Sequence, residues 1–257
     1  MSKKILIMMY LEGASCIEFA GRIGGNFAIE RVVFDVNTVV ETLVVQNVEV
    51  YVCDVYQKGR EIAERNLTDK SKRVPTAKLE ELCNAGLDGV FLVGAHAKNG
   101  APNAFYSYTV NEVSWFQYRL NGLELGDIGI AATYFGTFGI PVLFVSGDNG
   151  ACNEAAGLIN GITCAQVKTS RYRNLATCLS STEAKVLLQE KTSEAVAKIS
   201  TIQPYTTQKP YVIEVTYSRV DFCDECMRYY IGVAERVDAL NVRRSLDEIH
   251  GINDLRF

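Results

Sequence analysis

The chain has 257 residues, 48% hydrophobic and 22% charged, a composition that can bury a core and is not that of an intrinsically disordered segment. Its formal net charge of −4 provides no basic surface for a polyphosphate backbone, so we expect no nucleic-acid partner. No apolar run approaches the ~20 residues that cross a bilayer, so we expect no membrane partner and a cytoplasmic location.

Short apolar runs predict the strands of a buried sheet. They lie at Lys4–Tyr10, Val48–Cys53, Gly89–Val93 and Val142–Val145. Between the first two runs, aliphatic side chains from Ile29 to Val44 recur at helical spacing, which predicts a helix that packs on the sheet. This alternation of strands and helices is typical of a parallel α/β arrangement.

Later segments add further elements. The alternating pattern of Val113–Leu120 predicts an antiparallel strand, and Tyr211–Tyr217 predicts another strand after a proline-marked connection. A capping-box motif at 180–183 opens a helix to about Ile199, and a similar motif at 245–248 predicts a short final helix. We therefore expect an α/β fold with a mostly parallel central sheet flanked by helices, and a smaller antiparallel, α+β C-terminal portion.

Eight cysteines occur in a chain without a secretion signal, so we expect mostly free thiols. Cys223 and Cys226 form the one close pair. A single CxxC lacks the second pair that a structural zinc site needs, so two incidental helix cysteines are favoured over a metal or redox site.

Polar residues that follow the predicted strands are the candidate site residues, because ligands of open α/β sheets bind outside the carboxyl ends of the strands. These residues are Tyr10, Glu12, Asp54, Tyr56, His96, Asp148 and Asn149, with Asp127 at the start of its helix. Each has a simpler interpretation, such as a buried structural histidine for His96 or a loop cap for Glu12. Their grouping at strand ends favours a site.

Three segments together resemble the DppA-type D-aminopeptidases, a family of zinc metallopeptidases. They are KILIMMYLEG (Lys4–Gly13), GVFLVGAHAKNGAP (Gly89–Pro102) and GDIGIAATYFGTFGIPVLFVSGDN (Gly126–Asn149), in the family's order and spacing. The resemblance extends from Lys4 to about Leu240. It implies one D-aminopeptidase-like α/β domain over residues 1–257, with about 204–257 as a candidate small lobe. It also implies self-association into homo-oligomers, in this family decamers.

The family's dizinc site is only partly matched. Glu12 and His96 stand where the family has a glutamate and a histidine ligand, and Asp127 stands where it has a glutamate. Tyr10 replaces the bridging aspartate and Tyr56 replaces a histidine ligand. The family's catalytic histidine is matched by Tyr108.

These replacements decide what chemistry we expect. A phenol titrates near ~10, so it is a poor zinc ligand at neutral pH. We predict no cofactor or a weakly bound zinc on Glu12, His96 and Asp127. His96, Glu12, Asp127 and Tyr108 are the predicted catalytic residues. The predicted substrate-binding residues are Tyr10, Tyr56, Asp54 and Asn149.

Three functions stay open from the sequence. The first is a divergent D-aminopeptidase-like enzyme that acts on a small peptide, amino acid or amide without the family's dizinc centre. The second is a non-catalytic protein that binds a peptide-like or amino-acid-like ligand or serves in assembly. The third is a metal-dependent aminopeptidase or hydrolase with a rearranged zinc site. The fold alone cannot choose among them.

Overall fold

The computed structural model describes residues 2–55 and 66–257, so Tyr56 lies outside the described residues. The helices are α1 (Asn26–Val45), α3 (Leu79–Asn84), α4 (Asp127–Gly136), α5 (Asn149–Leu158), α6 (Ser181–Ala197) and α7 (Val220–Tyr229), with short 3-10 turns at Ala20–Arg22 (η1), Thr76–Lys78 (η2) and Ile252–Leu255 (η3). The strands are β1 (Lys3–Met9), β2 (Val48–Asp54), β3 (Lys72–Arg73), β4 (Gly89–Ala95), β5 (Trp115–Leu120), β6 (Leu123–Glu124), β7 (Val142–Asp148), β8 (Thr163–Tyr172), β9 (Leu175–Cys178), β10 (Tyr211–Tyr217), β11 (Glu235–Arg236) and β12 (Asn241–Leu246).

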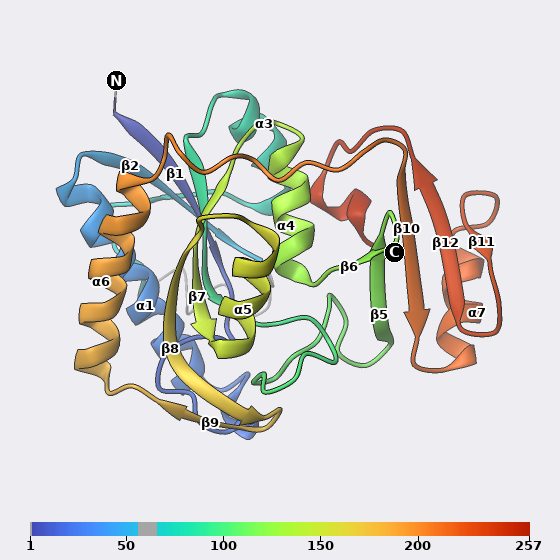
Figure 1. The fold of residues 1–257 in the computed structure, drawn as a ribbon, viewed down its shortest axis with the longest axis horizontal. Coiled ribbons are helices and arrows are strands. Elements are labelled where there is room, and N and C mark those ends of the chain that lie inside the picture. The colour runs from blue at the N-terminus through green and yellow to red at the C-terminus, as the bar shows by residue number, and fades with distance from the viewer. Residues whose placement is uncertain (1, 56–65) are drawn as a thin grey trace.

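A seven-stranded sheet forms the centre of the molecule, in the order β3-β2-β1-β4-β7-β8-β9. Its strands pair in parallel except β9, which is antiparallel to β8. Helices α1 and α6 lie on one side of this sheet and α4 and α5 on the other (Figure 1). From β1 the chain adds β2 toward one edge of the sheet, and from β4 it adds β7 and β8 toward the other edge. Because crossovers between parallel strands are right-handed, the crossover helices of the two halves lie on opposite faces. The predicted central sheet is confirmed.

The core of the sheet consists of near-continuous apolar strands. Every residue of β4 and β7 is buried, as are the last five residues of β1. Strands covered by helices on both faces need this pattern, since neither face meets water.

A second, antiparallel sheet has the order β11-β12-β10-β5-β6. In β10 buried residues alternate with partly exposed ones, as expected where one face packs on a core. The predicted antiparallel portion is confirmed, although two of its strands, β5 and β6, come from the middle of the chain. The sheet lies beyond α4, at the right of Figure 1.

The predicted capping box of α6 is present, since the Ser180 side chain accepts from the Glu183 backbone and the Glu183 carboxylate accepts from the Ser180 backbone. The predicted helix at 245–248 is wrong. Ser245 lies in β12, where it pairs with Val212 of β10. The last helical turn begins instead after Gly251, so strand pairing overrides a local capping motif.

All eight cysteines are free thiols, as expected, and the two of the CxxC pair are buried on α7. Within residues 2–55 and 66–257, no helix is both long and apolar enough to cross a membrane.

Candidate functional site

Five of the predicted site residues gather at the carboxyl ends of β1 and β4. Tyr10 and Glu12 follow β1, His96 follows β4, Tyr108 lies in the loop after β4, and Asp127 is the first residue of α4. The strand order changes direction between β1 and β4, which is the usual ligand position in an open α/β sheet. All five side chains are buried.

The two strand ends are held together by direct backbone contact. The Tyr10 amide donates to the Val93 carbonyl at 2.8 Å, and the Gly13 amide donates to the Gly94 carbonyl at 2.7 Å. A Cβ atom at Gly13 would lie 1.9 Å from the Ala95 carbonyl oxygen. Only glycine permits this approach, which fixes Glu12 beside the end of β4.

His96 is at the centre of the cluster. Its Nδ1 lies 3.1 Å from the Ala97 carbonyl oxygen, so the proton on Nδ1 is donated there and Nε2 faces the Asp127 carboxylate at 3.9 Å. Its ring stacks on Tyr108 with centroids 4.0 Å apart and meets the Tyr10 ring edge-on at 6.2 Å. Burial disfavours the imidazolium, but the negative charges of Glu12 and Asp127 outweigh it and raise the pKa of His96.

The two carboxylates are held by protein donors. The Tyr108 hydroxyl donates to Glu12 Oε1 at 2.8 Å, and the Leu11 amide donates to Oε2 at 3.2 Å. The Val110 amide donates to Asp127 Oδ2 at 2.9 Å. Tyr108 therefore contacts both His96 and Glu12, and it links the imidazole to the first carboxylate.

Tyr10 stays a neutral phenol. Burial is the main cause that raises its pKa, and the negative charge of Asp127 adds to it. Lys168 lies beneath the same loop, where its ammonium donates to the carbonyls of Glu12 at 2.7 Å and Ile17 at 3.2 Å. Burial lowers the pKa of Lys168 to about 8.

Two predicted substrate-binding residues lie apart from these contacts. The Asn149 side chain donates to the carbonyls of Asn103 at 2.8 Å and Ser170 at 3.3 Å and accepts from the Ser170 amide at 2.6 Å. These bonds join three chain segments. Asp54, at the end of β2, lines a hollow of about 250 Å³ together with Met9 and Arg73.

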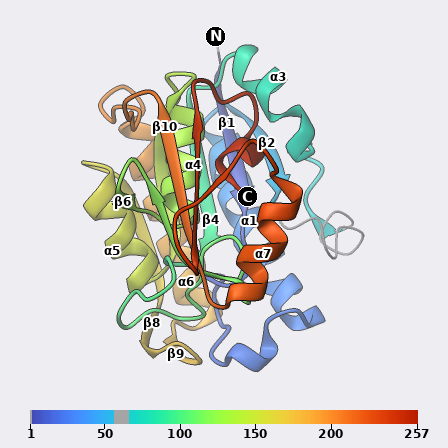
Figure 2. The same ribbon diagram turned by 90° about the vertical axis from the view of Figure 1, so that its right-hand side faces the viewer.

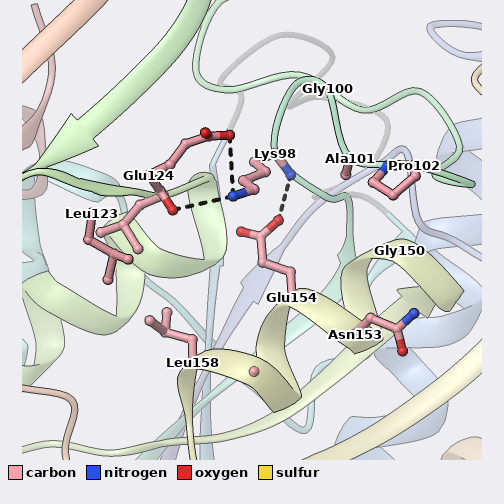
Figure 3. Close-up of a pocket in the computed structure, with 12 residues that line it drawn as sticks. Lys98, Gly100, Ala101, Pro102, Leu123, Glu124, Gly150, Asn153, Glu154 and Leu158 are labelled. Atoms are coloured by element: carbon pink, nitrogen blue, oxygen red, sulfur yellow. Dashed lines mark hydrogen bonds and ion pairs between the residues drawn. The ribbon is translucent and has the colours of Figure 1, made fainter.

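A pocket of about 590 Å³ lies between α5, the loop after β4 and the β6 segment (Figure 3). Its wall includes Lys98, two residues after His96, and Leu125, two residues before Asp127, together with α5. Glu154 of α5 accepts from the Lys98 amide at 2.6 Å, while its Oε1 is buried without a hydrogen-bond partner in the described chain. Burial raises the pKa of Glu154 to about 7.

No sequence pattern points to Glu154 or to a second charged residue, Arg256. Arg256 follows the η3 turn, and its Nη2 lies 3.9 Å from Asp127 Oδ1. Neither residue belongs to a recognisable motif, because each reaches the site through packing of distant segments.

The donor set of the described residues does not fit a zinc centre. Among residues 2–55 and 66–257, no group of three or more histidine, cysteine, aspartate or glutamate side chains could hold a metal ion. Glu12 and Asp127 accept protein hydrogen bonds, and the phenol of Tyr10 keeps its proton. Zinc sites need ionised or neutral-imidazole ligands that face one point.

Comparisons with known proteins agree on one family. The profile of the D-aminopeptidase family matches residues 4–254. A D-aminopeptidase of Bacillus subtilis (strain 168) is 32% identical over 137 residues, which cover 52% of this chain and 49% of that protein. The chain thus spans about half the length of this curated relative.

The fold is similar to a solved structure described as "Zn-dependent D-aminopeptidase DppA from Bacillus subtilis, a self-compartmentalizing protease". The TM-score is 0.89, and the match covers 98% of this chain and 94% of that one. At 19% identity this likeness shows the shared fold alone.

Proposed function

The chain belongs to the D-aminopeptidase family, and from this premise we propose that it acts on a small peptide, amino acid or amide without the family's dizinc centre. The convergence of His96, Glu12, Asp127 and Tyr108 at the β1–β4 switch point is the observation that carries the proposal. An imidazole whose pKa is raised, flanked by two carboxylates, is suited to proton transfer near neutral pH.

The contacts of each side chain suggest its role. Because Nδ1 of His96 faces the Ala97 carbonyl, Nε2 is the atom that gives and takes the proton, and Asp127 stabilises the imidazolium. Tyr108 orients both groups. In amide hydrolysis, water forms the new C–O bond and passes a proton to Glu12. The C–N bond then breaks, and the leaving amine takes its proton from His96.

The adjoining pocket supports a small substrate with an apolar portion. Its volume of about 590 Å³ is in the ordinary range for small-ligand sites. Leu123, Leu125 and Leu158 provide apolar lining, and Lys98 and Glu154 provide polar groups (Figure 3). A peptide or an amino-acid amide has both an apolar side chain and polar groups, which suit this lining.

Hydrolysis of D-alaninamide and L-alaninamide by the purified protein tests the proposal. We expect turnover of the D-amide and its loss in His96→Ala, because the proton-transferring atom is removed. His250→Ala is the matched control, since His250 is exposed. Equal rates for His96→Ala and the parent would overturn the catalytic role of His96. No turnover of any short peptide or amide would overturn the proposal and favour a non-catalytic binding protein.

We also propose that the chain assembles with copies of itself, in a cytoplasmic location. The solved relative is described as self-compartmentalizing. In this chain large apolar side chains are exposed around α7, with Tyr229 at 80% and Ile231 at 78%. Contact with another copy would remove this apolar surface from water.

A further inference from the structure

Arg256 reaches the site because the segment that carries it is anchored. Ile252 and Leu255 of the η3 turn are buried, and the turn packs on α4, whose first residue is Asp127. The Arg244 guanidinium of β12 donates to the carbonyls of Asp254 and Arg256. The main chain is therefore fixed on both sides of Arg256.

The Arg256 guanidinium itself makes no hydrogen bond within the described chain. Its Nε is buried without a partner, and its Nη2 is 3.9 Å from Asp127 Oδ1, which is beyond hydrogen-bond distance. Its attraction to Asp127 is therefore one of charge.

The site needs a cation at this point. Asp127 is 5% exposed, and burial of an ionised group without a counter-charge is costly. The helix N-terminus and the Val110 amide stabilise Asp127 in part. His96 contributes a positive charge only in the fraction of molecules in which it is protonated, whereas an arginine is always charged.

We propose that the Arg256 guanidinium is the built-in cation of this site and takes the electrostatic place of a metal ion, with Asp127 as its ion-pair partner. Arg256 acts through Asp127 and is a positioning residue. The positive charge of Arg256 lowers the pKa of Tyr10, whereas burial raises it, because a nearby cation favours the phenolate. The inference rests on the site assignment of the proposed function.

Zinc titration of the full-length protein by calorimetry tests this inference. Arg256→Met removes this positive charge from beside the Asp127 carboxylate. We expect this variant to gain at least about tenfold in zinc affinity, which corresponds to ~1.4 kcal/mol of added attraction. Arg256→Lys keeps the charge and should bind zinc as the parent does. Arg243→Met is the matched control, because Arg243 pairs with Glu214 in the second sheet.

Equal zinc affinity of Arg256→Met, Arg256→Lys and the parent would overturn the inference. If Arg256→Met does not fold, the melting temperature is measured in an Asp127→Asn background. Recovery of folding there supports charge compensation, and no recovery overturns it. Neither readout depends on turnover. An inactive protein with the expected zinc gain therefore refutes only the proposed function, and an active protein without the gain refutes only the role of Arg256.

Discussion

Among single residues, Tyr108 has the contacts that hold the cluster together. Its ring stacks on His96 and its hydroxyl donates to Glu12 at 2.8 Å. The ring and the hydroxyl have separable roles, because phenylalanine keeps the first and removes the second. A second residue, Glu154 of α5, accepts from the Lys98 amide. Its carboxyl group should change its protonation state near neutral pH.

Tyr108→Phe should lower turnover of D-alaninamide and destabilise the fold by about 1–3 kcal/mol, the usual cost of losing a hydrogen bond to a buried charged group. Rates and urea unfolding measure the two effects. Tyr172→Phe is the control, since Tyr172 is 64% exposed. Parent-like rate and stability in Tyr108→Phe would show that the hydroxyl does not position Glu12.

Glu154 should make stability depend on pH. Its pKa is raised from 4.5 to about 7, so between these values the folded state holds a proton that the unfolded state has released. The contribution of the Glu154 carboxyl to the free energy of unfolding is therefore fully present below pH 4.5 and is lost as the pH rises toward 7. The loss is on the order of 3 kcal/mol at most, at 1.36 kcal/mol per unit.

Glu154→Gln should show a smaller loss of unfolding free energy between pH 5 and pH 8 than the parent, by urea titration. Asp35, whose pKa is raised to about 6 mainly by burial, titrates in both proteins and cancels in the comparison. An identical loss in variant and parent would mean that Glu154 is ionised throughout this range.

Four of the five clustered residues were predicted because each follows a recognisable strand or opens a helix, and Tyr108 was predicted only from the family resemblance. Arg256 and Glu154 were not predictable in this way. Arg256 reaches Asp127 because the η3 turn packs on α4 and Arg244 of β12 holds the main chain beside it, and Glu154 on α5 meets the distant Lys98 amide. Local patterns do not encode such contacts.

At the scale of elements, strands were predicted better than short helices. The apolar runs that form β1, β4 and β7 are typical of strands buried on both faces, so few other structures suit them. The motif at Ser245 failed because its residues gain more from pairing with β10 than from a capped turn. Helix α4 contains several small residues, and one of them, Gly136, makes a close backbone contact that no sequence pattern indicates.

Gly136→Ala should destabilise the protein by about 1–3 kcal/mol or more, as overpacked sites do. The new Cβ would lie 1.8 Å from the Tyr205 carbonyl oxygen, so the backbone would have to shift. Gly157→Ala in α5 is the matched control, because its Cβ would meet open space, and it should be neutral or stabilising by up to ~1 kcal/mol. Equal unfolding free energies for the two variants would contradict the contact.

For the whole molecule, the arrangement of the two sheets leaves α7 and the residues that follow it on one outer face (Figure 2). Tyr229, Ile231 and Val233 are exposed there. The large sheet holds Tyr10, Glu12 and His96, and the segment after the second sheet delivers Arg256. The completed site therefore depends on the packing of the large sheet and of the η3 turn on α4.

Ile231→Lys should reduce the molecular mass of the protein measured by light scattering while leaving its circular dichroism unchanged, because a charge disfavours burial against another copy. Val45→Lys is the control, since Val45 is 87% exposed at the end of α1. A monomeric parent at micromolar concentration would contradict the proposed self-association.

We propose that the His96 cluster works with its own charges and without bound metal. The most direct test is the rate of D-alaninamide hydrolysis before and after dialysis against chelator, with the zinc content measured on the same samples. We predict well under one zinc per chain, and an unchanged rate and melting temperature after chelation. Two tightly bound zinc ions per chain, with activity lost on chelation and restored by zinc, would contradict the account.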